Sequence, residues 1–316
     1  MQTTPPAGLF SFGTLTLPAV QESLFGSPVP HAAAALLGHG LVDVPITDPE
    51  VIRLSGSAVH RGLARRVADR VDGVVLTLTA EQLAAADAYE VDAYARRRVL
   101  IADPDGVAPA PRTAWAYVAA DPLAAAERIA VAGDSIAFGL SDPDGGWAGH
   151  LARHHGNADG RRLWNLAVPG LTLAELDRHL DAEASLRRVD TVLIGAGIND
   201  LRADHGPTRP ADLVTRMDTL CARREAAGCR PVVLTPLWVD VPRADAEFGM
   251  HVRLRDAAEY RERLLTWGEQ THRDVVDLWP VLEDRPERLT DGVHPDVQGH
   301  AMLWDRLRGS GSPRVV

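Results

Sequence analysis

The sequence contains no lysine, so all 33 of its lysine-plus-arginine positions are arginines. Against 43 acidic residues they leave a formal net charge of −10 at pH 7. Binding to nucleic-acid phosphates or to an anionic membrane requires a basic surface, so this charge balance argues against both kinds of partner. We attribute the absence of lysine to genomic composition and not to function.

Cysteines and long apolar runs are also scarce. The two cysteines, Cys221 and Cys229, lie on and just after a predicted helix and have no histidines at ligand spacing, which argues against a disulfide framework and against a zinc site. No run reaches the roughly 18 apolar residues of a transmembrane helix, and the first residues lack the charged and apolar regions of a signal peptide. We therefore expect a soluble, cytoplasmic protein.

The chain is long enough for two domains. It has 316 residues, and its 46% hydrophobic content allows each half to build a core. A stretch of small residues at 119–127, which contains Pro122, lies between two predicted strands and marks the expected boundary. We expect one domain at residues 1–122 and another at residues 123–316.

Short strands dominate the first of these regions. Strands are predicted at residues 9–15, 40–46, 71–78, 98–102 and 113–118, with turn-rich segments at 103–106 and 109–112. One clear helix is predicted at residues 80–90, with Thr79 as its N-cap. This pattern indicates a small α+β or barrel-like domain.

Four motifs in this region are FSFGTL at 10–15, LAAADAYE at 83–90, YAR at 94–96 and AWAY at 114–117. In order and spacing they resemble the γ-glutamylcyclotransferase-like fold, also called the AIG2-like family, over about residues 8–120. The resemblance implies that Glu90 is a general acid/base. It also implies a loop whose backbone N–H groups hold the carboxylate of the substrate, formed by Phe12, Gly13, Thr14 and Leu15.

Glu90 suits the chemistry that this resemblance implies. Cyclising a γ-glutamyl amide to 5-oxoproline moves a proton from the α-amine to the leaving amine, and one carboxylate within reach of both can carry it. The sequence departs from the family pattern at Phe12 (usually Tyr), Ala86 (usually Leu) and Val91 (usually Gly), which keeps the acid/base and leaves the substrate open. The alternative is that Glu90 is an exposed charge near a helix end and that the domain is a binding module or an inert relic.

Strands and helices alternate from residue 128 onward. Strands are predicted at residues 129–132, 163–167, 191–195, 231–234 and 274–278, and helices at 147–155, 173–186, 210–227, 253–272 and 297–307. Nearly continuous apolar strands separated by amphipathic helices predict a parallel sheet that is covered on both faces. In such a sheet the ligand lies outside the carboxyl ends of the strands.

The residues after these strands suit acyl transfer. Ser135 follows the first strand in a Gly-Asp-Ser turn. Its hydroxyl can project from the edge of the sheet there, and backbone N–H groups at the start of the helix can point at a developing oxyanion. Gly170 and Asn199 end the segments after the second and third strands, and Asp291 and His294 lie three apart after the fifth. Each alone has an ordinary explanation as a turn residue, a helix cap or one of twelve histidines. Their occurrence after strands of one sheet argues for a common site.

Together these segments resemble the SGNH, or GDSL, hydrolase family over about residues 127–308. The resemblance implies a flavodoxin-like parallel sheet with helices on both faces. It implies that Ser135 is the nucleophile, that His294 is its general base and that Asp291 orients the imidazole. It also implies an oxyanion hole formed by the backbone N–H groups of Ser135 and Gly170 and the side-chain NH₂ of Asn199. This chemistry requires no metal or redox cofactor.

Other polar residues near these segments are given structural or lining roles. Asp134 and Asp200 are expected to hold their loops through hydrogen bonds to backbone N–H groups. His300 is expected to pack against or cap the last helix. His205, just after Asn199, is expected to line the substrate pocket.

The segment at residues 237–251 is long for a connection between a strand and a helix. Its apolar side chains include Trp238, Phe248 and Met250, which are expected to be exposed. We expect it to form a lid or an acyl-binding wall, with a dimer contact as the alternative.

The sequence therefore predicts a two-domain enzyme that acts on small molecules. One domain is a serine hydrolase for an ester or acetyl group, and the other releases 5-oxoproline and a free amine from a γ-glutamyl amide. Fusion raises the concentration of one site's product at the other, which suggests that both act on one molecule. Two alternatives stay open: the first domain is a non-catalytic substrate-binding or scaffolding module, or neither site turns over and the chain binds a small molecule or carbohydrate. The acyl group and the oligomeric state are left open.

Overall fold

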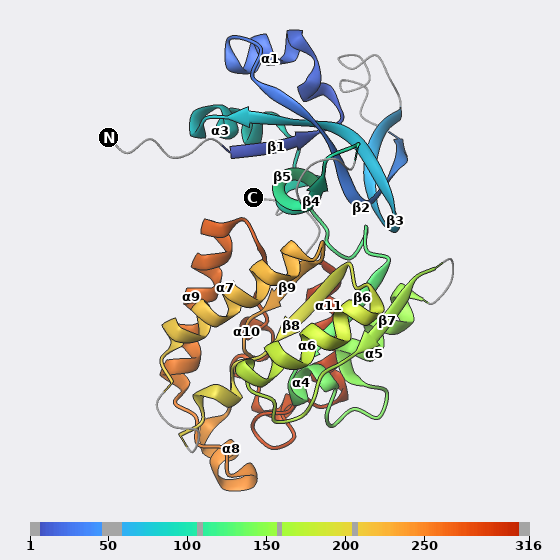
Figure 1. The fold of residues 1–316 in the computed structure, drawn as a ribbon. Helices are drawn as coiled ribbons and strands as arrows, with labels where there is room; N and C mark the ends of the chain where they lie inside the picture. Colours follow the sequence, from blue (N-terminus) through green and yellow to red (C-terminus); the bar gives the residue numbers. More distant parts are fainter. Residues whose placement is uncertain (1–6, 46–58, 106–109, 157–159, 204–207, 310–316) are drawn as a thin grey trace. The chain divides into compact units, whose positions relative to one another are not determined.

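A computed structural model describes residues 7–45, 59–105, 110–156, 160–203 and 208–309 (Figure 1). The chain divides into two compact units. Residues up to Ala126 make up nearly all of the first unit, and nearly all of the second follows from Glu127. The assignment of separate functions to residues 1–122 and 123–316 stays a prediction.

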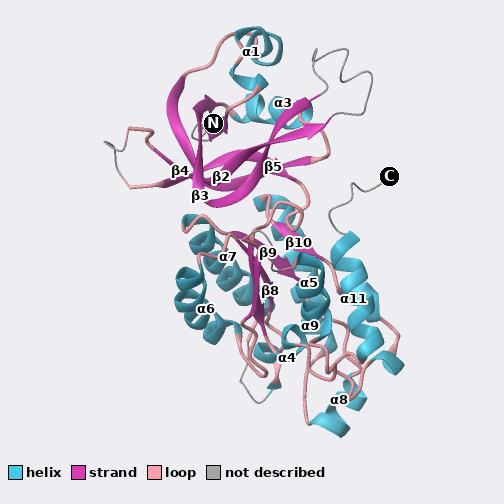
Figure 2. Ribbon diagram, turned by 90° about the vertical axis from the view of Figure 1, so that its right-hand side faces the viewer, coloured by secondary structure: helices cyan, strands magenta, loops and turns pink. Residues whose placement is uncertain are grey.

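The first unit is a closed five-stranded barrel with the strand order β1-β3-β2-β4-β5 (Figure 2). Its neighbouring strands are antiparallel except for β1 and β5, which are parallel where Leu9 lies opposite Trp115. This confirms the prediction of a barrel-like domain. Its elements are β1 (Ala7–Ser11), η1 (Thr14–Thr16), α1 (Pro18–Phe25), β2 (His31–Pro45), β3 (Val59–Leu78), α3 (Ala80–Tyr89), β4 (Tyr94–Ala102) and β5 (Arg112–Ala119).

Alternate residues of the strands supply two apolar clusters. One cluster fills the barrel interior and includes Phe10, Val75 and Ala116. The other includes Leu9 and Leu76 and packs against apolar side chains of α1 and α3. Because successive side chains of a strand point to opposite faces, the same strands serve both clusters.

Several elements of the first unit differ from the prediction. The expected strand at residues 9–15 ends at Ser11, and Thr14 enters a short 3₁₀ helix. Strands β2 and β3 are longer than their apolar runs, because they pair with each other along residues whose side chains face solvent, such as Arg61 and Asp43. The helix α1 was not predicted. The predicted N-cap Thr79 is confirmed, since its hydroxyl accepts a hydrogen bond from the N–H of Gln82 at 3.2 Å.

The second unit contains a five-stranded sheet with the order β10-β9-β8-β6-β7, in which every neighbouring pair is parallel. The predicted parallel sheet is therefore confirmed. Its elements are β6 (Arg128–Gly133), α4 (Ser135–Phe138), α5 (Gly146–His155), β7 (Arg162–Asn165), α6 (Leu173–Arg187), β8 (Thr191–Gly195), η2 (Asn199–Leu201), α7 (Pro210–Ala226), β9 (Arg230–Leu234), α8 (Val241–Phe248), α9 (Leu254–Thr271), β10 (Asp274–Val276), α10 (Trp279–Leu282), η4 (Pro286–Arg288) and α11 (Val297–Gly309).

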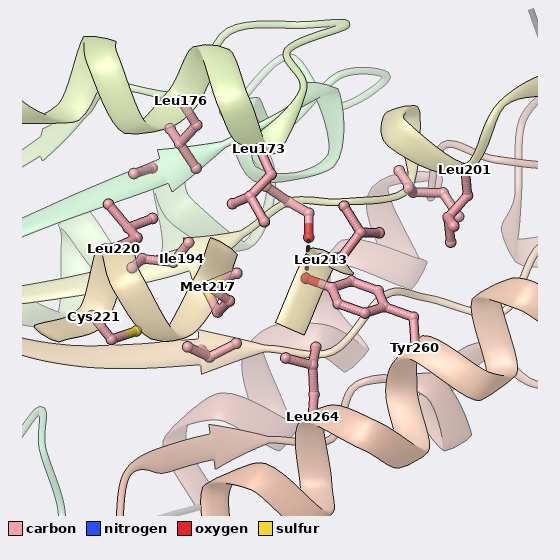
Figure 3. Close-up of a cluster of buried hydrophobic side chains, with 14 of the residues drawn as sticks. Leu173, Leu176, Ile194, Leu201, Leu213, Met217, Leu220, Cys221, Tyr260 and Leu264 are labelled. Atoms are coloured by element: carbon pink, nitrogen blue, oxygen red, sulfur yellow. Dashed lines mark hydrogen bonds between the residues drawn. The ribbon is translucent and has the colours of Figure 1, made fainter. Parts of the chain in front are cut away.

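Both faces of this sheet are buried. On one face, strand residues such as Ile194 and Val233 pack with side chains of α6, α7 and α9, among them Leu176 and Leu264 (Figure 3). On the other face, Leu234 lines a pocket together with a residue of α5. Adjacent strand residues therefore contact different helices, as expected for a strand with a helix layer on each side.

The segment at residues 237–251 is partly helical, which the sequence analysis did not anticipate. It contains α8, which begins after Asp240 and is ended by Gly249 in the left-handed conformation. The expectation that its apolar side chains are exposed was wrong for Met250, which is buried, and for Trp238, which packs partly buried against the core. The chain turns back after α8, where the N–H of Met250 donates to the carbonyl of Ala244 at 3.0 Å, and the Met250 side chain lies in the core cluster.

Both cysteines, Cys221 and Cys229, are buried. Among the described helices, none combines the length and the apolar character needed to span a bilayer.

Candidate active site

Ser135 lies at the turn where β6 passes into α4. Gly133 ends the strand so close to β8 that a Cβ atom on it would lie 2.1 Å from the carbonyl oxygen of Gly195, so only glycine fits there. Asp134 is the N-cap, and its side chain accepts a hydrogen bond from the N–H of Ile136 at 3.0 Å. Ser135 is therefore the first residue of the helix, where backbone N–H groups have no partner within the helix.

A chain of hydrogen bonds connects Ser135, His294 and Asp291. The Oγ atom of Ser135 lies 2.8 Å from Nε2 of His294, and Nδ1 of His294 lies 2.6 Å from Oδ2 of Asp291. Both contacts are satisfied when Nδ1–H donates to the carboxylate and the serine hydroxyl donates to Nε2. Ser135 and His294 are both buried. The structure thus brings together three residues that are 159 and 3 positions apart in the sequence.

Hydrogen bonds among its own residues hold the loop that carries His294. Oδ1 of Asp291 accepts hydrogen bonds from the N–H groups of Val293 and His294, at 3.0 and 2.9 Å. Burial alone would raise the pKa of Asp291, but these bonds and the bond from the imidazole outweigh it and hold the pKa below its ordinary value. Thr290 also donates from its N–H to the carbonyl of His294 at 2.7 Å. Asp291 can therefore stay ionised while it is hydrogen-bonded to the imidazole.

Asn199 and the loop of Gly170 lie together. The Nδ2 atom of Asn199 donates to the carbonyl oxygen of Leu171 at 3.1 Å, and Asp200 accepts a bond from the N–H of Leu173 at 2.8 Å. Gly170 sits at an exposed turn with φ 82°, a backbone conformation that favours glycine. The loops after β7 and β8 are thus joined next to both predicted oxyanion donors.

The same region connects to the turn of Ser135. Asn165 donates from its side chain to the carbonyl of Ala137 at 3.1 Å, and the N–H of Val168 donates to the carbonyl of Gly133 at 3.0 Å. The predicted loop-holding roles of Asp134 and Asp200 are confirmed by their bonds to backbone N–H groups. Three loops that are far apart in the sequence therefore converge at one edge of the sheet.

Asp134 is buried beneath this site. Its burial raises its pKa to about 7, although backbone hydrogen bonds from Ile136 and Ala137 oppose the shift. The neighbouring carboxylate of Asp200 adds to the increase. At neutral pH this group is therefore poised between its protonated and ionised forms.

An apolar pocket adjoins Ser135. It is lined by both neighbours of the serine, Asp134 and Ile136, and by Trp147, Ala196 and Leu237, and its cavity volume is about 30 Å³. The indole N–H of Trp147 is buried without a hydrogen-bond partner among the described residues, which leaves one donor for a bound group.

The contacts that two aromatic residues make at the site were not predicted from the sequence. The ring of Phe248, at the end of α8, meets the imidazole of His294 edge-on, with ring centroids 4.9 Å apart. Tyr260 on α9 donates to the carbonyl of Ala196 at 3.2 Å, within the loop that leads to Asn199 (Figure 3). Apolar periodicity marked Tyr260 only as a residue of a predicted helix, and nothing in the local sequence indicates which loop a ring will contact.

His300 and His205 are the other two histidines that were given roles from the sequence. His300 is fully buried, and its ring contacts the carbonyl of Leu140 at 3.1 Å and the N–H of Trp147 at 3.4 Å, so it is a packing residue. His205 lies outside the described residues. Within the described ranges, no group of three or more His, Cys, Asp or Glu side chains is arranged to hold a metal ion.

The predicted acid/base of the first unit, Glu90, caps the C-terminal end of α3 and is half-buried. Burial raises its pKa, and a hydrogen bond with the backbone of Val91 partly opposes the increase. Burial and the nearby Glu90 carboxylate together raise the pKa of Tyr94. Burial and the hydrogen bond to Asp87 raise the pKa of Tyr117, and Glu90 makes a smaller contribution in the same direction. Glu90 thus lies near two phenol groups in a partly dehydrated setting.

Next to these residues, Asp87 is held by two partners. Arg96 donates two bonds to its carboxylate, at 2.8 and 2.9 Å, and the hydroxyl of Tyr117 donates a third at 2.8 Å. The guanidinium of Arg96 also lies 4.6 Å from the ring centroid of Trp115. Asp87 is therefore engaged in structural contacts with Arg96 and Tyr117.

The predicted carboxylate-holding loop lies at the end of β1. Gly13 and Thr14 are exposed, and Gly13 precedes the 3₁₀ helix η1. The side chains of Phe12 and Leu15 instead pack, Phe12 against the barrel interior and Leu15 in the outer cluster. Because the Leu15 side chain is buried in packing, only the backbone of this residue could contact a ligand, whereas Gly13 and Thr14 are exposed.

Two family models match the chain. The GDSL-like lipase/acylhydrolase family matches residues 131–302, and the AIG2-like gamma-glutamyl cyclotransferase family matches residues 9–135. No curated protein matches the sequence.

Solved structures resemble the larger part of the chain. An acetylxylan esterase from Geobacillus stearothermophilus is 18% identical, with a TM-score of 0.48, 59% of this chain covered and 94% of that chain. A member of the lipolytic G-D-S-L family from Veillonella parvula is 16% identical, with a TM-score of 0.46, 57% of this chain covered and 94% of that chain.

Proposed function

Because the chain belongs to the GDSL-like lipase/acylhydrolase family, we propose that its second unit is a serine hydrolase that cleaves an ester or acetyl group from a small molecule. The observation that carries this proposal is the hydrogen-bonded contact of 2.8 Å between Ser135 Oγ and His294 Nε2, with Asp291 on the other side of the imidazole. The same constellation of three side chains performs acyl transfer on several unrelated folds.

In the proposed reaction, Ser135 attacks the carbonyl carbon of the ester while His294 takes the hydroxyl proton. The oxyanion that forms is held by the N–H groups of Ser135 and Gly170 and by the amide of Asn199. When the tetrahedral intermediate collapses, the C–O bond to the alcohol breaks and His294 delivers the proton to the leaving oxygen. Water then attacks the acyl-enzyme with His294 again as the base, which releases the acid and restores Ser135.

The proposed substrate carries a short acyl group. The pocket beside Ser135 is a small cavity of about 30 Å³, and its lining is mostly apolar, with Ile136, Trp147 and Leu237 among the residues. Such a volume suits an acetyl or similarly short group better than a long fatty acyl chain.

For the first unit we propose γ-glutamylcyclotransferase activity. The α-amine of a γ-glutamyl amide attacks the γ-carbonyl carbon, the bond to the leaving amine breaks, and Glu90 carries the proton between the two nitrogens. The raised pKa of Glu90 supports this role, because a carboxyl group whose pKa is closer to neutrality exchanges protons more readily. The alternative remains a non-catalytic module that binds the substrate of the hydrolase.

The hydrolase is tested with a fluorophosphonate probe and a short ester. The probe should label the wild-type chain on Ser135, and Ser135→Ala should abolish both labelling and turnover of 4-nitrophenyl acetate. Ser185→Ala is the matched control, because Ser185 is exposed on α6 and bonds only within its helix at 3.0 Å to the carbonyl of Asp181. A folded wild-type protein that is not labelled would favour the binding-protein alternative.

A further inference from the structure

The helix α8 is attached to the loop that carries His294. Arg243 donates to the carbonyl oxygens of Leu289, at 2.7 Å, and Thr290, at 2.6 Å. The N–H of Asp240 donates to the carbonyl of Gly292 at 3.0 Å. The helix and the loop are therefore bonded at several points, and they are expected to move together.

The helix α8 and the loop of His294 are also in close contact. A Cβ atom on Gly292 would lie 2.4 Å from the backbone nitrogen of Ala244, so no side chain fits between helix and loop. Arg243 is further paired with Glu247 at 3.0 Å along the helix. This attachment fixes the position of the last residue of α8, Phe248.

The Phe248 side chain contacts His294 and is also partly exposed to solvent. Its ring meets the imidazole of His294 at a centroid distance of 4.9 Å and an interplanar angle of 86°. His294 is only 1% exposed, whereas Phe248 is 45% exposed. The aromatic ring thus contacts the imidazole and still presents apolar surface to an incoming molecule.

The chemistry of acyl transfer decides which part of a substrate meets this surface. The imidazole that takes the proton of Ser135 must next deliver it to the leaving oxygen, so that oxygen lies within hydrogen-bond reach of Nε2. A substituent on that oxygen extends past the imidazole. The acyl chain, by contrast, is attached to the carbonyl carbon and extends away from the leaving oxygen.

We propose that Phe248 is a specificity-determining residue of the leaving-group site, and that this site favours esters of alcohols with a flat apolar face, such as benzyl esters. The assignment rests on the proposed hydrolase function. Phe248 contacts the alcohol part by ring stacking or edge-to-face packing, and it has no role in the acyl-enzyme once the alcohol has left.

Two esters with one acyl group test this assignment. Benzyl acetate and ethyl acetate form the same acetyl-enzyme from alcohols of similar acidity, so they differ in what their alcohol can contact. Aromatic contacts of this kind correspond to roughly a tenfold change in selectivity. Phe248→Ala should therefore lower the ratio of kcat/KM for benzyl acetate to that for ethyl acetate about tenfold, and Phe248→Tyr should preserve it.

Two controls separate this role from others. Leu186→Ala removes another exposed apolar side chain on distant α6 and should leave the ratio unchanged. Hydrolysis of the acetyl-enzyme, followed after rapid acylation, should be the same in Phe248→Ala and in the wild type.

Three outcomes would overturn the assignment of Phe248 to the leaving-group site. An equal loss on both esters, together with slower hydrolysis of the acetyl-enzyme, would show that Phe248 only positions His294 and would overturn the specificity assignment. An unchanged ratio in Phe248→Ala would also overturn it while the hydrolase function stands. A wild-type protein that cleaves neither ester and is not labelled on Ser135 would remove the hydrolase function and this assignment together.

Discussion

The side-chain amide of Asn199 donates a hydrogen bond to the main-chain carbonyl of Leu171, 28 residues earlier in the chain, at a distance of 3.1 Å. This bond uses one of the two hydrogens on Nδ2 and fixes the plane of the amide. The second hydrogen is then held in a constant direction. Such a preorganised donor costs no reorganisation when charge develops on a substrate oxygen.

Replacing Asn199 by Ala is expected to lower kcat on short acyl esters by roughly 100-fold or more, with a smaller effect on KM, because an oxyanion donor contributes about 3 kcal/mol in the transition state. Steady-state kinetics measure the split between kcat and KM. Thermal unfolding of the same variant reports the separate cost of losing the bond to Leu171. A decrease in kcat of less than fivefold in a folded variant would remove Asn199 from the oxyanion hole.

Gly197 lies between the bonded carbonyl of Ala196 and Asn199, and its φ is 119°. A Cβ atom there would lie 2.5 Å from the ring of Tyr260. We expect Gly197→Ala to lower the free energy of unfolding by about 2–4 kcal/mol, from backbone strain and from displacement of a packed ring, and to reduce turnover by displacing Asn199.

Gly195→Ala is the control for this loop, because its Cβ would meet its nearest neighbour, Leu234, at an ordinary 3.6 Å. It should change the unfolding free energy much less than Gly197→Ala in chemical denaturation. Equal stability of the two variants would contradict the steric role assigned to Tyr260.

Asp134 makes stability depend on pH. Its pKa is raised from an ordinary 3.8 to about 7 by burial, so the folded state binds its proton more tightly than the unfolded state does. The stabilisation from the protonated form is complete below pH 4 and is lost as pH rises toward 7, by roughly 1.4 kcal/mol per unit of pKa difference. Asp134→Asn should remove this loss.

Denaturation curves between pH 4 and pH 8 measure this effect. The stability difference between Asp134→Asn and the wild type should shift in favour of the variant as pH rises through this window and then level off. Asp305→Asn, at an exposed position paired with Arg308, is the control. A difference that stays constant with pH would show that Asp134 ionises normally in the folded chain.

Much of the hydrolase site could be predicted because it depends on local signals. A strand that ends in a Gly-Asp-Ser turn places Ser135 at a sheet edge, and the spacing of Asp291 and His294 allows the carboxylate to bond both the backbone and the ring of one short loop. Parallel strands bring their carboxyl ends together, so the convergence of these segments follows from the fold class.

Other features could not be predicted because they depend on distant partners. Phe248 was noted only as an apolar residue of a long connection, and its contact with His294 is set by bonds between Arg243 and carbonyl oxygens that carry no sequence information. In the first unit, β3 extends over polar residues such as Arg61 and Arg70, because pairing with β2 satisfies its backbone without an apolar pattern. Local patterns therefore predicted the position of Ser135 better than the contacts around it.

Glu90 provides the last test, of whether the first unit is an enzyme. We expect the full-length protein to release 5-oxoproline from a γ-glutamyl amine and Glu90→Gln to abolish this release, because the amide cannot carry a proton between the two nitrogens. Ester hydrolysis should be unchanged in the same preparation. Glu81→Gln, at an exposed position in the first turn of α3, is the matched control and should retain both activities.

The pH dependence of 5-oxoproline release tests the role of Glu90 in a second way. Burial raises the pKa of Glu90, and the carboxylate form is the one that accepts the proton, so 5-oxoproline release should fall as the pH is lowered through a value above the ordinary 4.5. If no γ-glutamyl amine yields 5-oxoproline while short esters are cleaved, the first unit is a binding module. In that case Glu90→Gln leaves all turnover intact, and removal of residues 1–122 alters the KM of the hydrolase.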